Sequence, residues 1–175
     1  MSLHLILGGA RSGKSSFAES LVLSSPLSSR HYVATATKSD QEMQRRIEHH
    51  QARRDDSWRL HECPLDIDIL LSNFTDQDIV LIDCLTLWMS NVIFENGQTA
   101  TEEAINQRVE RLIEALSLSQ SDVILVSNEV GLGVVPMGEV SRLFVDHAGW
   151  MNQAIAKIAD KVTFVAAGLP MQLKG

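Results

Sequence analysis

Short apolar runs alternate with longer segments of mixed polarity along the chain. The clearest run is D-I-V-L-I-D at 78–83, and others begin near Leu3 and Asp122. Apolar runs of this length, bounded by polar residues or glycine, are typical of strands that are buried on both faces. The predicted strands span 3–7, 31–36, 57–63, 78–83, 122–127 and 161–167.

Helical spacing of apolar residues fills the intervals between these runs, as at Phe17, Leu21 and Val22. The predicted helices span 14–23, 40–54, 65–71, 85–94, 101–118 and 138–158. Strands that alternate with helices predict an α/β fold, with a mostly parallel sheet that carries helices on both faces. The 175 residues contain no repeat or linker, so we expect a single domain that spans 1–175.

Composition and charge narrow the possible partners. Apolar residues make up 45% of the chain and charged residues 21%, which excludes intrinsic disorder. Fifteen basic residues against 22 acidic residues give a net charge of −7, which argues against a nucleic-acid binder and a polybasic membrane anchor. This balance still permits a local basic pocket for a small phosphorylated ligand.

Targeting signals and cysteine chemistry also give little reason to expect a membrane or secreted protein. No run approaches the roughly 18 apolar residues of a membrane span, and no basic region precedes the run at Leu3 as in a signal peptide. Cys63 and Cys84 lack the spacing of a zinc site and are too few for a disulfide framework. We therefore expect reduced thiols in a cytoplasmic protein.

The segment G-G-A-R-S-G-K-S at 8–15 matches the phosphate-binding pattern G-x-x-x-x-G-K-[ST] in full, between a predicted strand and a predicted helix. Backbone N–H groups and the helix N-terminus would cradle phosphates there. Lys14 would act catalytically on the outer phosphates, and the Ser15 hydroxyl would bind Mg²⁺. The sequence thus predicts a P-loop NTPase-type domain whose nucleotide contacts are Gly8, Gly9, Ala10, Arg11, Ser12, Gly13, Lys14 and Ser15.

Asp83 closes the apolar run at 79–82. An acid at the end of a buried strand commonly supplies the second half of the Mg²⁺ site in a P-loop protein. The alternative is that Asp83 caps the helix predicted to follow it. We expect Cys84, the next residue, to be packed rather than nucleophilic.

The predicted helix at 40–54 carries two neighbouring histidines on different faces. At 100° per residue, His49 shares a stripe with Arg46 and Arg53, whereas His50 shares the apolar side with Met43 and Ile47. A neutral imidazole among arginines can attack phosphorus and hold it as a phosphoramidate. The alternatives are a solvated polar face for His49 and a packed, hydrogen-bonded histidine at position 50.

Weaker signals lie at the ends of other predicted strands. Thr35 and Thr37 could contact a nucleotide or cap the next helix, and Arg54, Trp58 and Glu62 could hold a base or form an ordinary surface strand. The segment 128–131, N-E-V-G, follows a buried strand, where α/β proteins collect polar groups. A helix cap would explain Asn128 equally well.

Taken together, these motifs resemble the bifunctional adenosylcobinamide kinase/adenosylcobinamide-phosphate guanylyltransferases of cobalamin assembly. The resemblance covers nearly the whole chain, and the paired histidines and the N-E-V-G loop are its most specific parts. The motifs are G-G-A-R-S-G-K-S at 8–15, A-T-A-T at 34–37, E-M-x-x-R-I-x-H-H at 42–50, W-R-x-x-E at 58–62, S-N-E-V-G-L-G-V-V-P at 127–136 and A-G-x-x-N-Q at 148–153.

This resemblance implies two reactions, with GTP and ATP as substrates, Mg²⁺ as cofactor and a corrinoid, adenosylcobinamide, as acceptor. It implies that His49 is the guanylylated residue, and that the enzyme is a homo-oligomer, a trimer. The implied metal ligands are Ser15 and Asp83. Beyond the P-loop, the implied nucleotide contacts are Thr35, Ala36, Thr37, His50, Gln51, Ala52, Arg53, Arg54, Glu62 and Asp83.

Two other functions are compatible with the P-loop. One is a different small-molecule kinase, which would need no covalent histidine. The other is a nucleotide-gated switch, but such proteins usually carry D-x-x-G and N-K-x-D motifs. Here Asp83 is followed by C-L-T and no N-K-x-D occurs, which counts against the switch.

Overall fold

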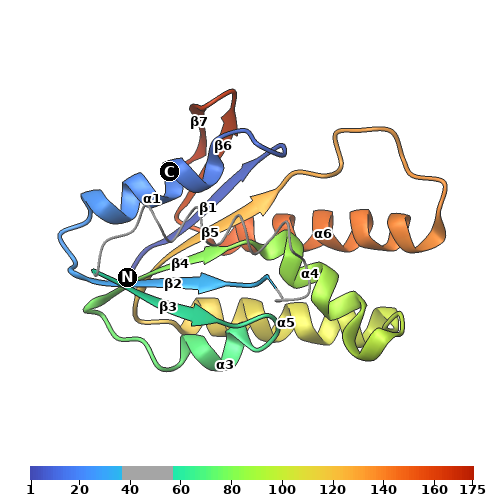
Figure 1. Ribbon diagram of the computed structural model, residues 1–175, viewed down its shortest axis with the longest axis horizontal. Helices are drawn as coiled ribbons and strands as arrows, with labels where there is room; N and C mark the ends of the chain where they lie inside the picture. The colour runs from blue at the N-terminus through green and yellow to red at the C-terminus, as the bar shows by residue number, and fades with distance from the viewer. Residues whose placement is uncertain (37–56) are drawn as a thin grey trace.

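A seven-stranded sheet forms the centre of the computed structural model, which describes residues 1–36 and 57–175. The strand order is β3-β2-β4-β5-β1-β6-β7, and every neighbouring pair is parallel except β6 and β7 (Figure 1). The predicted mostly parallel sheet is therefore confirmed. The strands are β1 (Leu3–Gly8), β2 (Ser29–Ala34), β3 (Trp58–Glu62), β4 (Asp78–Asp83), β5 (Asp122–Asn128), β6 (Lys161–Ala166) and β7 (Leu169–Lys174).

Helices cover both faces of this sheet, as the alternating pattern predicts (Figure 1). On one face α1 packs against Ile6, Leu81 and Val126. The other face carries the larger core, in which Trp88 is almost fully buried and donates its indole N–H to the Leu65 carbonyl at 2.7 Å. The helices are α1 (Lys14–Ser24), α3 (Ile67–Leu71), α4 (Leu85–Ile93), α5 (Glu102–Leu118) and α6 (Glu139–Ile158), with a short 3₁₀ turn, η1 (Glu95–Gly97).

The central strands β1, β4 and β5 are continuous apolar runs because both of their faces are buried. Along β4, Ile79 and Leu81 belong to the α1-side core, whereas Val80 and Ile82 belong to the core on the opposite face. Since β1 to β6 are all parallel, their carboxyl ends meet at one edge of the sheet. The carboxyl-end edge, as we call it, carries Gly8, Ala34, Asp83 and Asn128.

Strand β7 was not predicted, and the prediction that the sheet ends with β6 is wrong. The residues Ala167 and Gly168, with φ of 51° and 78°, turn the chain back so that β7 pairs antiparallel with β6. Pro170 weakens the strand pattern, yet proline is tolerated in an edge strand because it needs no ladder N–H on its open side. Strand β2 also ends at Ala34 rather than at residue 36.

The helix predicted over 40–54 lies outside the described residues. Within the parts of the chain that the structure describes, no helix is long and apolar enough to cross a bilayer. Cys63 and Cys84 both carry free thiols.

Candidate nucleotide-binding site

The P-loop connects the end of β1 to the start of α1. Gly13 caps α1 with φ of 98°, a left-handed conformation that glycine adopts without steric cost. A side chain at Gly8 would collide with the backbone carbonyl oxygen of Val165 on β6. The glycines therefore give this loop a shape that other residues would disturb, and the strand–loop–helix context predicted for it is confirmed.

Lys14 lies inside this loop and is only 6% exposed. Its ammonium group donates to the Gly9 carbonyl at 2.5 Å and lies 3.5 Å from the Ser12 hydroxyl. Burial lowers the pKa of Lys14, while the nearby Asp83 carboxylate opposes that shift. The loop thus holds a partly desolvated cation, which is the group needed to neutralise phosphate oxygens.

Asp83 ends β4 on the same edge and faces this cation. One of its carboxylate oxygens accepts a hydrogen bond from the Tyr32 phenol of β2 at 3.2 Å. Helix α4 is capped by Cys84, so the alternative role of Asp83 as its N-cap is not supported. Burial, followed by the Asp83 charge, raises the pKa of Cys84 to about 11, which agrees with a packed thiol rather than a nucleophile.

Thr35 links the ends of two neighbouring strands. Its side chain is fully buried, and its hydroxyl accepts from the Cys84 N–H at 2.9 Å and donates to the Cys84 carbonyl at 2.8 Å. Its backbone carbonyl accepts from Asn91 of α4 at 2.8 Å. These contacts tie the ends of β2 and β4 together beside Asp83. A nucleotide contact at Thr35 stays a prediction.

The β6–β7 hairpin supports the P-loop from the other side. The Gly168 N–H donates to the Ser12 carbonyl at 2.8 Å, and a side chain on Gly13 would approach the Gly168 Cα to 3.1 Å. Sequence reasoning missed Gly168. The signal that could have found it is the Ala-Gly pair between two apolar segments, which is typical of a tight hairpin turn.

Glu62 lies at the far end of the carboxyl-end edge. It ends β3, which is four strand positions from β1, or about 19 Å at the usual strand spacing. Trp58, at the other end of β3, packs edge-on against Tyr32 with ring centroids 6.3 Å apart. A nucleotide contact at Glu62 or at the half-exposed Ala36 stays a prediction. The predicted residues outside the described parts of the chain are Thr37, His49, His50, Gln51, Ala52, Arg53 and Arg54.

The residues suited to a metal ion are few. Ser15, in the first turn of α1, and Asp83 offer hydroxyl and carboxylate oxygens near the P-loop. Across residues 1–36 and 57–175, no group of three or more histidine, cysteine, aspartate or glutamate side chains could enclose a metal ion. This donor set fits a hard cation that takes most of its oxygens from water and phosphate, as Mg²⁺ does.

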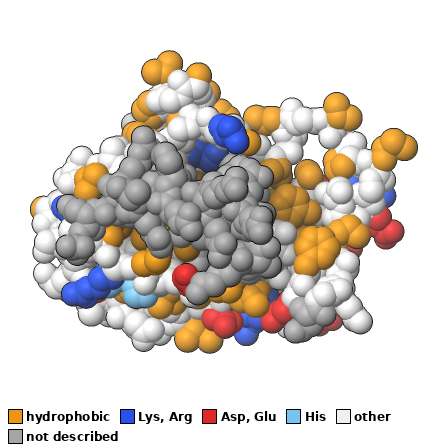
Figure 2. Space-filling model, viewed as in Figure 1, with side chains coloured by type: hydrophobic (Ala, Val, Ile, Leu, Met, Phe, Trp, Pro, Cys, Tyr) orange, Lys and Arg blue, Asp and Glu red, His pale blue; other side chains and the backbone are white. Residues whose placement is uncertain are grey.

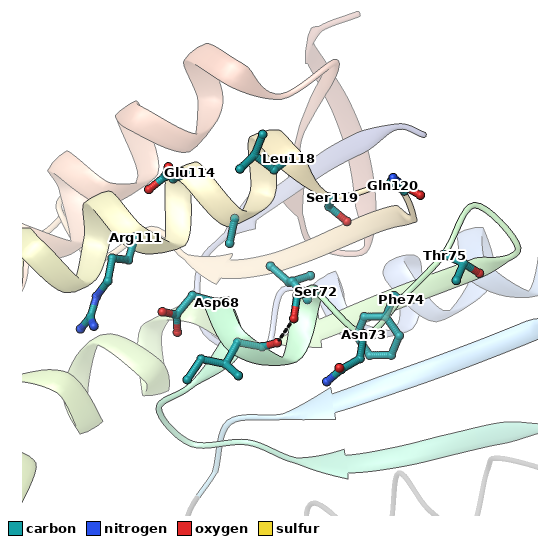
Figure 3. Close-up of a pocket in the computed structure, with 13 residues that line it drawn as sticks. Asp68, Ser72, Asn73, Phe74, Thr75, Arg111, Glu114, Leu118, Ser119 and Gln120 are labelled. Atoms are coloured by element: carbon teal, nitrogen blue, oxygen red, sulfur yellow. Dashed lines mark hydrogen bonds between the residues drawn. The ribbon is translucent and has the colours of Figure 1, made fainter.

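A groove of about 740 Å³ lies between α3 and the second half of α5 (Figure 3). Asp68, Arg111 and Glu114 border it, while Phe74 and Leu118 contribute apolar surface. Its end at Thr75 and Gln120 leads into β4 and β5, so the groove belongs to the opposite edge of the sheet from the P-loop. No predicted site residue lines it.

Solved structures share this fold at low sequence identity. The flagellar accessory protein FlaH from Methanocaldococcus jannaschii aligns with a TM-score of 0.53 and 16% identity, over 99% of this chain and 78% of its own. The ATPase EscN from enteropathogenic Escherichia coli aligns with a TM-score of 0.57 and 10% identity, over 95% of this chain and 43% of its own. These likenesses confirm the P-loop NTPase-type fold and nothing further.

Relatives found by sequence have a much higher identity to this chain than these solved structures have. The bifunctional adenosylcobalamin biosynthesis protein CobP of Pseudomonas aeruginosa is 49% identical over 172 residues, which cover 98% of this chain and 96% of the relative. The corresponding CobU proteins of Salmonella typhimurium and Escherichia coli are each 38% identical over 180 residues, covering 97% of this chain and 98% of the relative. The family model for cobinamide kinase / cobinamide phosphate guanyltransferase matches residues 4–173. The chain therefore belongs to this family of bifunctional enzymes, as its motifs predict.

Proposed function

We propose that this protein phosphorylates adenosylcobinamide and then transfers GMP to the product. In the first step the aminopropanol hydroxyl oxygen attacks the γ-phosphorus of ATP or GTP. The bond from that phosphorus to the β–γ bridging oxygen breaks, the nucleoside diphosphate leaves, and the hydroxyl proton passes to a base. The partly desolvated Lys14 beside the P-loop backbone supports this step, because it would neutralise charge on the outer phosphates.

The second step uses His49 as a covalent carrier. An imidazole nitrogen attacks the α-phosphorus of GTP, and pyrophosphate leaves. A phosphate oxygen of adenosylcobinamide phosphate then attacks the same phosphorus, which breaks the N–P bond, regenerates His49 and yields adenosylcobinamide-GDP. The support is the sequence pattern, which places His49 on the arginine stripe of its predicted helix, and the family to which the chain belongs.

Mg²⁺ is part of the proposal because the available donors suit it. Asp83 and Ser15 would hold the ion, which would draw negative charge from the phosphates when bound. The residues of this chain do the remaining work. Tyr32 orients the Asp83 carboxylate, and Thr35 fixes the backbone next to it.

Self-association in the cytoplasm completes the proposal, with a trimer as the expected state. Apolar side chains are exposed on the loop before α6 and on β7, where Figure 2 shows hydrophobic groups at the upper right and at the top. Val134 and Met137 are 97% and 96% exposed, and Leu169 is 70% exposed. Apolar surface of this extent suits burial against another copy.

The position of Lys14 inside the P-loop carries the proposal, and its removal tests it. We expect Lys14→Ala to bind ATP and GTP at least 10-fold more weakly by calorimetry and to lose both reactions, since the phosphates lose their principal counter-charge. Lys157→Ala, which removes an exposed lysine from the last turn of α6, is the matched control. Nucleotide affinity and turnover near the wild-type values in Lys14→Ala, with circular dichroism unchanged, would remove the P-loop from the mechanism.

A further inference from the structure

Asn128 ends β5 at the carboxyl-end edge, directly beside the P-loop. It is in register with Gly8 on β1, while the other neighbour of β5, β4, ends at Asp83 in register with Val126. Asn128 thus lies two residues further along the edge than Asp83, or about 7 Å at the usual strand rise. This is the space that the outer phosphate of a nucleotide in the P-loop would approach.

A structural role for the Asn128 side chain finds no support. The cap that the sequence allowed is wrong, because α6 begins at Glu139 with Gly138 as its N-cap. Every hydrogen bond that Asn128 makes within the described residues uses its backbone. Its side chain follows Ile124 and Val126, which face α1, and is only half-buried.

Three contacts fix the backbone beneath this amide. The Asn128 N–H donates to the Thr86 hydroxyl at 2.7 Å, its carbonyl accepts from Asn152 at 3.5 Å, and the next N–H, of Glu129, donates to the Gly8 carbonyl at 3.0 Å. Thr86 and Asn152 come from α4 and α6 and are 8% and 5% exposed. Helices from the opposite face of the sheet thus hold one residue against the P-loop.

The position that lets Asn152 donate to the Asn128 carbonyl lowers the stability of the folded chain. Its Oδ1 atom is buried without a hydrogen-bond partner among the described residues. A buried polar atom left without a hydrogen bond destabilises a protein, because its lost hydration is not replaced. Asn152 is therefore poorly explained by stability alone, whereas a need to fix the Asn128 carbonyl explains it.

From this arrangement we infer that the Asn128 amide contacts the transferring γ-phosphoryl group in the kinase reaction. The inference rests on the proposed kinase function. An N–H of the amide donates to an equatorial oxygen, where charge spreads in the transition state. A neutral donor suits the position, because a carboxylate there would add repulsion beside Asp83 and the phosphates. Asn128 exchanges no proton and forms no covalent bond.

The test compares a transition-state mimic with a ground-state nucleotide. We expect Asn128→Ala to bind ADP within about threefold of wild type by calorimetry, but to bind ADP with aluminium fluoride and Mg²⁺ roughly 10²-fold more weakly, which is the usual cost of losing one preorganised donor. The kinase kcat falls by a similar factor, with KM for ATP little changed. Asn73→Ala, an exposed asparagine near the Figure 3 groove, should match wild type.

The supporting contacts supply a second pair of variants. Thr86→Ser keeps the hydroxyl that accepts from Asn128 and should retain the affinity for the aluminium fluoride complex, whereas Thr86→Val should weaken it. Equal affinity of Asn128→Ala and wild type for that complex, or equal weakening for ADP and the complex, overturns the inference. A wild-type chain that binds the complex yet phosphorylates no adenosylcobinamide overturns the proposed function alone, because the nucleotide comparison still decides the role of Asn128.

Discussion

At the scale of single residues, the Tyr32 phenol orients the Asp83 carboxylate. The phenol is 7% exposed and lies 3.2 Å from a carboxylate oxygen of Asp83. We expect Tyr32→Phe to raise the Mg²⁺ concentration for half-maximal turnover roughly 10-fold, which corresponds to about 1.4 kcal/mol lost in positioning that carboxylate. Steady-state rates across a Mg²⁺ titration measure this effect.

Asp83→Asn provides the comparison for Tyr32→Phe. It should retain nucleotide binding but lose most turnover, since a neutral amide is a much weaker ligand for Mg²⁺ than a carboxylate. If both variants show the Mg²⁺ dependence of wild type, Asp83 does not act at the metal and the Tyr32 contact is only structural.

At the scale of secondary-structure elements, the β6–β7 hairpin should strengthen nucleotide binding by supporting the P-loop. Gly168→Ala places a side chain at φ of 78°, which costs about 1 kcal/mol, and disturbs the turn whose N–H holds Ser12. Gly97→Ala imposes similar strain at φ of 74° in η1, where no P-loop contact is made. Both variants should lose similar stability in urea unfolding, but only Gly168→Ala should bind ATP more weakly. Equal affinity of the Gly168→Ala and Gly97→Ala variants for ATP would show that the hairpin does not support nucleotide binding.

Much of the architecture follows from local sequence. Strand β4 has the bounds predicted for it, and α5 begins after Thr101, whose hydroxyl accepts from the Ala104 N–H as a helix cap. Strand β7 escaped prediction because its side chains are all exposed, so no apolar run marks it, and because Pro170 interrupts its pattern. Its existence depends on pairing with β6, which is a tertiary contact.

Some residues of the candidate site could likewise be predicted from local sequence, and others could not. Gly8 to Ser15 are identifiable because a P-loop needs a fixed order of residue types in adjacent positions. Tyr32, Thr86 and Asn152 are ordinary residues in their own segments and gain their roles only where strands from distant parts of the chain meet. The contact of Thr35 with Cys84 could not be predicted from the sequence, because it depends on the pairing of β2 with β4.

Stability of the whole molecule should fall as the pH drops below about 6.5. Burial lowers the pKa of His4, His61 and His147, with Lys161 adding to the shift at His4, and with His31 and then Arg59 adding to it at His61. The unfolded chain, with ordinary histidine pKa values near 6.5, then binds more protons than the folded chain. Stability is therefore complete above that pH and decreases below it.

The His61 contribution has a geometric basis. Its Nε2 atom lies 2.9 Å from Nδ1 of His31, and Nε2 of His31 lies 3.1 Å from the Asp78 carboxylate. Phe74 packs against both rings. Burial of His61 among these rings opposes its protonation in the folded chain. Urea unfolding at pH 5.5 and 7.5 measures the difference, and His61→Gln should reduce it. A chain that is more stable at pH 5.5 would contradict this prediction.

The covalent histidine is the central claim for the whole enzyme, and intact mass after incubation with GTP and Mg²⁺ tests it most directly. We expect wild type and His50→Ala to gain the mass of one GMP, and His49→Ala to gain none. The adduct should be labile in acid and survive base, as a phosphoramidate does. Absence of an adduct from wild type, or an adduct on His49→Ala but not on His50→Ala, would contradict the account.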